Sequence, residues 1–174
     1  IFSTILKKTY LYKMSIILNI RYSCPENLPE ELALLFISFF FSILFMQSGL
    51  DKVFNFYDNL KFFNNHFQKT IFSNQARLLL VLLTTFEVLT GATCLIGLVG
   101  VCVTGFSLQL MSILFLGMIL SSLTICCLFL GQRIANDYVG AANLTIYFLV
   151  SLIGLSLFFW LYPNNLFSLI ILST

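Results

Sequence analysis

Long apolar stretches with almost no charge constrain this chain more than any other feature of its sequence. Four of them, at residues 32–49, 78–99, 102–130 and 139–162, reach or exceed the roughly 17 residues that the shortest membrane-crossing helix needs. Only 9% of the residues are charged, whereas a soluble domain carries about 25%. The sequence therefore predicts an integral membrane protein with much of its outer surface in contact with lipid.

The four stretches predict an all-α integral membrane four-helix bundle that forms one domain over residues 32–162. Residues 1–31 are interpreted as an N-terminal extension and polar lead-in, in which the Pro-Glu-Glu at 29–31 favours a helix start. Residues 163–174 form a short apolar tail. Residues 1–13 are basic and lack a small-residue cleavage site, so a secretory signal peptide is not expected. An extension of the reading frame and a basic interfacial helix both remain open there.

Residues 51–70, between the first two crossings, show a different pattern. Large apolar side chains recur there at steps of three and four and so share one helical face, a stripe made of Val53, Phe56, Leu60, Phe63 and Phe67. We expect an amphipathic helix that lies in the membrane interface with this stripe turned toward the acyl chains. The alternative is a helix packed over the end of the bundle.

The positions of the basic residues predict an orientation. Lys52, Lys61, Lys69 and Arg77 lie between the first two crossings, and Arg133 lies between the last two. The positive-inside rule then favours these two loops in the cytoplasm and both termini on the other side. Arg21 lies on that other side, and Lys7, Lys8 and Lys13 would reverse much of the bias if they lie close enough to the bilayer to count. A bacterial inner membrane is the default location, although an organelle membrane would give the same composition.

Composition and motifs exclude several functions. A net charge of +2 without a dense basic patch argues against a nucleic-acid partner. The single histidine, His66, excludes haem held between two histidines. The chain has no phosphate-binding glycine loop, metal-ligand cluster or nucleophilic triad, so any catalysis would depend on a bound cofactor or a partner subunit. The five cysteines are odd in number and include no Cys-x-x-Cys, and we interpret them as packing residues.

Glu87 is the most unusual single residue, because an ionisable side chain at bilayer depth is costly. We expect it near the middle of the second crossing, facing the bundle interior. Two interpretations remain open: an acid that carries a proton or hydrogen-bonds a quinone, and a structural residue that joins two helices. Gln47 and Gln109 are candidate neutral partners, because an amide both donates and accepts. For each glutamine an ordinary inter-helix hydrogen bond is the favoured interpretation.

Two polar clusters mark helix ends. The first crossing is closed by Ser48-Gly49 with Asp51-Lys52, and the fourth is opened by Arg133 with Asp137 and Tyr138. Arg133 and Asp137 are four residues apart, a spacing that would let them pair on one helical face. Four crossings place both clusters on the same side of the membrane, where they would form a polar lid over Glu87. Ordinary interfacial anchors are the alternative.

Three segments resemble the DoxX family of membrane proteins. Residues 45–56 (FMQSGLDKVFNF) are similar to the motif that closes the family's first helix, and residues 86–97 (FEVLTGATCLIG) to its second helix. Residues 131–155 (GQRIANDYVGAANLTIYFLVSLIGL) resemble the start of its fourth helix. The match covers about residues 32–162 in the same order and spacing. It implies a four-helix membrane bundle.

The resemblance also implies a setting and a set of residues. Some DoxX relatives are associated with quinone-linked oxidation of sulfur compounds, and others with redox-stress complexes at the membrane. The family's intramembrane Glu corresponds to Glu87, its Gly-x-x-Lys-like turn to Gly49 and Lys52, and its Asp-Tyr to Asp137 and Tyr138. The chain lacks the cysteine pairs of the thiol-linked branch, which argues against a dithiol relay.

The expected function is an accessory or quinone-interacting component of a membrane redox system, with a membrane or soluble oxidoreductase subunit as its partner. The hypothesised quinone-binding residues are Glu87, Gln47, Gln109, Lys52, Arg133, Asp137 and Tyr138. Replacing Glu87 with Gln is expected to weaken quinone binding and leave the fold intact. The alternative is a non-catalytic scaffold that recruits a partner through residues 51–77. A third interpretation is a small-solute or proton carrier, which four helices could form only as a homo-oligomer.

Overall fold

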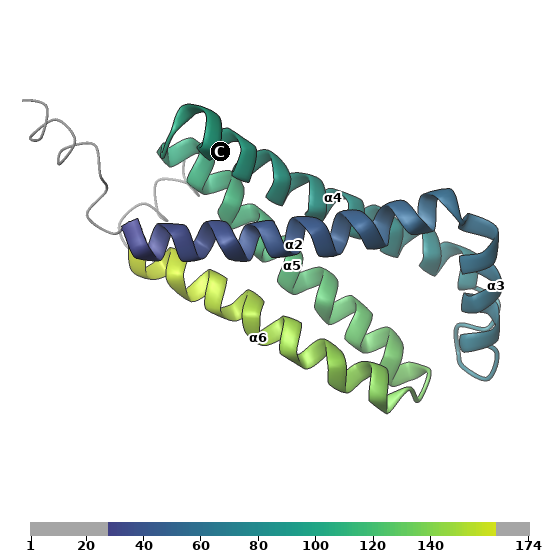
Figure 1. Ribbon diagram of the computed structural model, residues 1–174. Coiled ribbons are helices and arrows are strands. Elements are labelled where there is room, and N and C mark those ends of the chain that lie inside the picture. The colour runs from purple at the N-terminus through teal and green to yellow at the C-terminus, as the bar shows by residue number, and fades with distance from the viewer. Residues whose placement is uncertain (1–27, 163–174) are drawn as a thin grey trace, which may run out of the picture.

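The computed structural model describes residues 28–162, and within that range the chain is helical without any strand. The predicted all-α class is confirmed. The helices are α2 (Leu28–Phe54), α3 (Phe56–His66), α4 (Ala76–Thr104), α5 (Leu108–Ile134) and α6 (Tyr138–Leu161) (Figure 1). The predictions made for residues 1–27 and for the tail at 163–174 lie outside the described residues.

Four of these helices are long and apolar enough to cross a membrane: α2, α4, α6 and, from Gln109 onward, α5. They contain 24 to 29 residues each, which at 1.5 Å per residue gives lengths of about 36 to 44 Å. The hydrocarbon core of a bilayer is only about 30 Å thick. The helices therefore tilt or extend into the interfacial layers.

The turn between the second and third crossings lies later than predicted. The sequence placed it between residues 99 and 102, but α4 continues to Thr104 and α5 begins at Leu108. Gly105 ends α4 with φ at 84°, a conformation that suits glycine. Gly97 is helical instead and lets α5 approach, because a Cβ there would lie 2.7 Å from Leu114 Cδ2.

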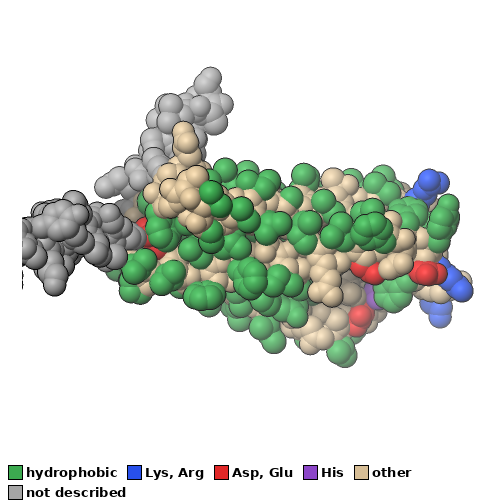
Figure 2. Space-filling view, turned by 45° about the horizontal axis from the view of Figure 1, so that its top comes forward, with side chains coloured by type: hydrophobic (Ala, Val, Ile, Leu, Met, Phe, Trp, Pro, Cys, Tyr) green, Lys and Arg blue, Asp and Glu red, His purple; other side chains and the backbone are tan. Residues whose placement is uncertain are grey.

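The long helices close into a ring. α2 packs along α4, α4 along α5 and α5 along α6, and a smaller contact between α6 and α2 completes the ring (Figure 1). The centre is filled by fully buried apolar side chains, including Phe41, Leu114, Met118 and Phe158. The hydrophobic flank of the molecule contrasts with the end near α3, where charged side chains gather (Figure 2).

The short helix predicted between the first two crossings is confirmed as α3. It lies across the end of the bundle (Figure 1). The buried Phe63 of α3, and Phe67 directly after its last residue, pack with Ala76 and Leu80 of α4. Val53 belongs to α2 and is about half exposed. The apolar stripe of α3 thus rests on protein, as in the alternative of a helix packed over the bundle's end.

Candidate functional site

Two glycines let α2 and α4 approach closely. A Cβ added at Gly49 would lie 2.8 Å from Val88 Cγ2 and 3.1 Å from Val88 N. A Cβ at Gly91 would lie 2.7 Å from Met46 N. Small residues at membrane helix contacts allow backbones to come this close. The side chains that flank these glycines are brought within bonding distance as a result.

Lys52, Ser48 and Glu87 meet at this contact. The Lys52 ammonium nitrogen lies 2.8 Å from Glu87 Oε2 and 3.1 Å from Oε1. Ser48 Oγ accepts from Lys52 at 2.7 Å and donates to Glu87 Oε1 at 3.1 Å. The side chains of Glu87 and Lys52 are only 1% and 12% exposed. A buried carboxylate therefore has an ammonium group and a hydroxyl as its partners.

The glutamines predicted to contact Glu87 do not reach it. Gln47 is exposed on the outer side of α2, and Gln109 is exposed in the first turn of α5. Ser48 and Lys52 are four residues apart and so share the face of α2 that meets Glu87, whereas Gln47 is turned about 100° away from Ser48. Glu87 thus pairs with Lys52 and not with a neutral glutamine. The sequence signal that could have indicated this ion pair is the four-residue spacing of Ser48 and Lys52.

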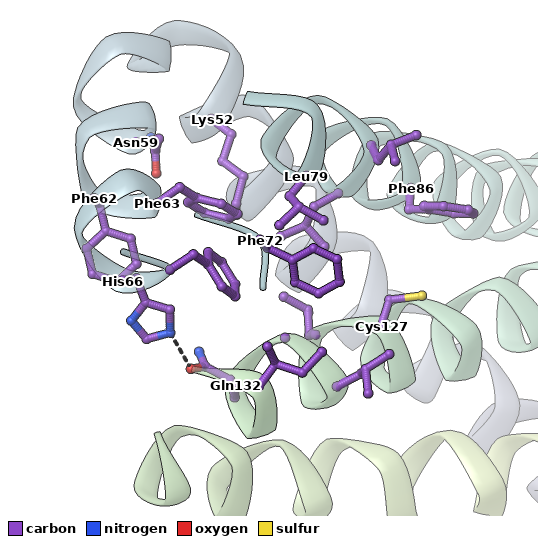
Figure 3. Close-up of a pocket in the computed structure, with 17 residues that line it drawn as sticks. Lys52, Asn59, Phe62, Phe63, His66, Phe72, Leu79, Phe86, Cys127 and Gln132 are labelled. Atoms are coloured by element: carbon purple, nitrogen blue, oxygen red, sulfur yellow. Dashed lines mark hydrogen bonds between the residues drawn. The ribbon is translucent and has the colours of Figure 1, made fainter. Parts of the chain in front are cut away.

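A cavity of about 440 Å³ lies beside this ion pair, between α3, α4 and α5 (Figure 3). Its wall is largely apolar and includes the aromatic side chains of Phe62, Phe63, Phe67, Phe72 and Phe86. Lys52 lines the cavity, whereas Glu87, which was expected to line a pocket, is not part of the wall. The Glu87 carboxylate therefore affects a ligand in the cavity only indirectly, by holding the Lys52 ammonium in place.

The cavity reaches the apolar flank of the molecule. Leu82 of α4 and Leu130 of α5 both line it, and their side chains are 49% and 59% exposed. These two helices are membrane-crossing segments, so lipid would cover their outer surfaces. A lipid-soluble molecule could reach the cavity from the side.

A hydrogen bond closes the cavity on the side away from Lys52. His66 Nε2 lies 3.0 Å from Gln132 Oε1 and so joins α3 to α5 (Figure 3). Asn59 of α3 also lines the cavity. His66 and Gln132 were not among the site residues predicted from the sequence, because their proximity depends on how α3 lies across the bundle.

Arg133, Asp137 and Tyr138 lie outside the cavity wall. The Arg133 guanidinium carbon is 4.6 Å from the centre of the Tyr138 ring, and Asp137 Oδ1 caps α6 by accepting from Gly140 N at 2.9 Å. The predicted pair of Arg133 with Asp137 is not among the ion pairs of residues 28–162. The reason is that Asn136, with φ at 61°, interrupts the helix between them.

Buried hydroxyl groups join the long helices. Thr90 and Thr124 are hydrogen-bonded at 2.9 Å between α4 and α5, and Ser122 donates to Ser151 of α6 at 3.0 Å. Such contacts hold membrane helices together. Within residues 28–162 no group of three or more His, Cys, Asp or Glu residues could hold a metal ion.

The fold and site define a four-helix membrane bundle with a buried ion pair at the wall of an aromatic cavity. Comparison with protein-family models, with curated proteins and with solved structures finds no match for this chain.

Proposed function

We propose that this chain is a DoxX-like protein of the bacterial inner membrane that binds the head group of a quinone, as an accessory component of a membrane redox system. The observation that carries the proposal is the phenylalanine-lined cavity with the Lys52 ammonium, held by Glu87, in its wall. A membrane or soluble oxidoreductase subunit would carry out the electron transfer.

The charge of the site favours a neutral ligand. The charge of Lys52 is already paired with that of Glu87 at 2.8 Å. A charged head group would lose its water on binding and would find no unpaired opposite charge in this ion pair, so its binding is disfavoured. The ammonium also contacts Ser48 O at 3.3 Å, the longest of its contacts. A ligand carbonyl could replace that contact and receive a charge-assisted hydrogen bond.

The shape and lining of the cavity suit an aromatic ring with an apolar tail. Its volume of about 440 Å³ lies in the range of small-molecule sites. Phenylalanine side chains interact with flat rings by offset stacking or by edge-to-face contact. The exposed Leu82 and Leu130 at its edge would let a tail continue into the acyl chains.

The arrangement of the family-like segments supports the DoxX assignment. Residues 45–56 supply Gly49 and Lys52, and residues 86–97 supply Glu87, and all three meet at one contact. Two of the three family-like segments therefore meet at the same buried contact, which supports a shared role for them. The third segment supplies Asp137 and Tyr138, which lie outside this contact.

Quantifying the quinones that co-purify in mild detergent tests the proposal. Wild type would be compared with the double variant Lys52→Met/Glu87→Gln, which removes both charges and leaves neither unpaired, and with Lys69→Gln, which alters an exposed side chain outside the cavity wall. We expect quinone in wild type and Lys69→Gln and a loss of about tenfold or more in the double variant. Absence of quinone from wild type, or equal retention in the folded double variant, would contradict the proposal.

The second candidate function is the scaffold that recruits a partner through residues 51–77. Exposed aromatic side chains at the junction of α2 and α3 favour it, because Phe54 is 79% and Tyr57 is 85% exposed. Acidic substitutions at these two positions would abolish co-purification of a partner if the scaffold role is correct. The same change at Phe63 is unsuitable, because Phe63 is buried and the substitution would unfold α3.

A further inference from the structure

The hydrogen bond between His66 and Gln132 leaves donors free at the cavity wall. Gln132 Oε1 can only accept, so His66 Nε2 carries the proton that joins them at 3.0 Å. The Gln132 amide nitrogen keeps both of its N–H groups, and it donates to no other side chain or backbone group within residues 28–162. Gln132 lines the cavity, so these donors are available to a ligand there.

The orientation of the Gln132 amide is fixed by its neighbours. The His66 ring stacks on Phe62 with centroids 5.2 Å apart and meets Phe67 edge-on at 5.2 Å. The backbone of Gln132 is held separately, because its carbonyl oxygen accepts a hydrogen bond from Asp137 N at 2.9 Å. A polar group held in this way loses little conformational freedom when a ligand binds.

Gln132 and Lys52 lie on opposite sides of the aromatic cavity. Lys52 comes from α2 and Gln132 from α5, and the Phe63 ring is drawn between them (Figure 3). Phe67 and Phe72 also line the cavity. Both residues present N–H donors. The cavity thus has a donor at each of two opposed ends and apolar walls between them.

Building on the proposed quinone site, we propose that Gln132, positioned by His66, is the second polar contact of the ring and that the site selects para-quinones. Lys52 donates to one carbonyl oxygen and the Gln132 amide donates to the opposite one. A ring with oxygen at one end only would leave one of these donors without a partner, which disfavours its binding. Gln132 is a specificity-determining residue in this arrangement, and His66 is a positioning residue.

A binding competition on the full-length protein in detergent tests this inference. The probes are a short-chain para-quinone and the corresponding ortho-quinone, whose two oxygens lie side by side at one end of the ring. We expect wild type to prefer the para-quinone by about tenfold. The variant Gln132→Met, which keeps the side-chain volume but has no donor, should lose most of that preference. The variant His66→Phe should reduce the preference partly, because it leaves the amide present but unpositioned. The control Lys69→Gln, at an exposed position outside the cavity wall, should bind as wild type does.

The outcomes separate this inference from the proposed function. If wild type binds both rings equally, or if folded Gln132→Met keeps the full preference, Gln132 is not the second contact, although quinone binding stands. If wild type binds neither ring, the proposed function itself fails. Should Gln132→Met not fold, the preference of wild type and the effect of His66→Phe decide the matter.

Discussion

The Lys52–Glu87 pair decides how substitutions at this site should behave. Removing charges from water is costly, and each partner offsets the cost of the other only while both are present. Lys52 Nζ and Glu87 Oε2 are 2.8 Å apart and both side chains are largely buried. Loss of one partner leaves the other uncompensated in the membrane domain. The sequence-based expectation that Glu87→Gln leaves the fold intact therefore needs revision.

We predict that Glu87→Gln lowers the free energy of unfolding by about 3 kcal/mol, because it leaves the Lys52 ammonium without a counter-charge. Lys52→Met should cost a similar amount. The double variant should be more stable than the sum of the two losses implies, by about 1 to 3 kcal/mol. Unfolding by a denaturing detergent, measured on all four proteins, gives this coupling energy. Strictly additive losses would show that the two side chains do not interact.

Tyr162 at the other end of the bundle predicts a pH dependence. Burial, followed by the nearby Glu31 carboxylate, raises the pKa of the Tyr162 phenol to about 12, and its hydroxyl donates to Glu31 Oε1 at 3.1 Å. The unfolded chain releases this proton near its ordinary value of about 10. The stabilisation is therefore intact below about pH 10 and is lost as the pH rises toward 12.

Stability measured against pH should consequently fall more steeply between about pH 10 and pH 12 in wild type than in Tyr162→Phe, which has no phenolic proton to lose. The phenolate absorbance of the folded proteins, compared in the same range, assigns the change to this residue. Parallel stability curves would rule out the proposed contribution of Tyr162.

The contact between α2 and α4 is sensitive to single methyl groups. We predict that Gly91→Ala destabilises the protein by about 1 to 3 kcal/mol, since its Cβ would lie 2.7 Å from the Met46 backbone nitrogen. Gly131→Ala in α5 is the matched control, because its Cβ would make only ordinary contact, 3.6 Å from Phe67 Cζ. That control should be neutral or slightly stabilising, as alanine favours the helix over glycine. Thermal unfolding in detergent compares the two, and equal effects would contradict the prediction.

The position of α3 depends on its buried aromatic side chains. Phe67→Ala should cost about 3 kcal/mol and should speed amide hydrogen exchange across Phe56–His66, because Phe67 packs against the start of α4. Tyr57→Ala, at an exposed position on the same helix, should change stability by less than about 0.5 kcal/mol. Unaltered exchange in Phe67→Ala would mean that other contacts hold α3 in place.

The helices were predictable from the sequence because apolar length and three-to-four spacing are local properties. The helix ends were less predictable: the turn expected between residues 99 and 102 lies at residues 105–107, because α4 continues to Thr104 and Gly105 ends it with a positive φ. The pairing of Arg133 with Asp137 failed for a similar reason. A spacing rule for helices does not apply across Asn136, whose positive φ separates α5 from α6.

The site was predictable only in part, because it is a property of the assembled bundle. The burial of Glu87 was predictable from its unusual position in an apolar stretch, whereas the direct contact of Lys52 with Glu87 was not predicted. The cavity was not predictable either, because its walls come from α3, α4 and α5, and the contact of His66 with Gln132 joins residues 66 positions apart. The wrong partners for Glu87 were proposed for the same reason: residue type alone does not say which face of a helix a side chain occupies.

The charge asymmetry of residues 28–162 predicts an orientation. All five Lys and Arg residues of this range belong to the α3 end or to the helix ends beside it, whereas Glu30 and Glu31 lie in the first turn of α2 at the other end. Charged side chains gather at the α3 end in Figure 2. The positive-inside rule places the α3 end, and with it the polar side of the cavity, in the cytoplasm.

Cysteine labelling with a membrane-impermeant reagent tests this orientation in a background where the native cysteines are replaced. We expect Asn64→Cys, at an exposed position of α3, to be protected in intact cells and labelled after permeabilisation. Thr104→Cys, exposed at the last residue of α4, should be labelled in intact cells. The reverse pattern would place α3 outside the cytoplasm. Under the proposed quinone function, a soluble oxidoreductase partner would have to approach Lys52 and Gln132 from the α3 end, so the labelling result would identify the compartment of that partner.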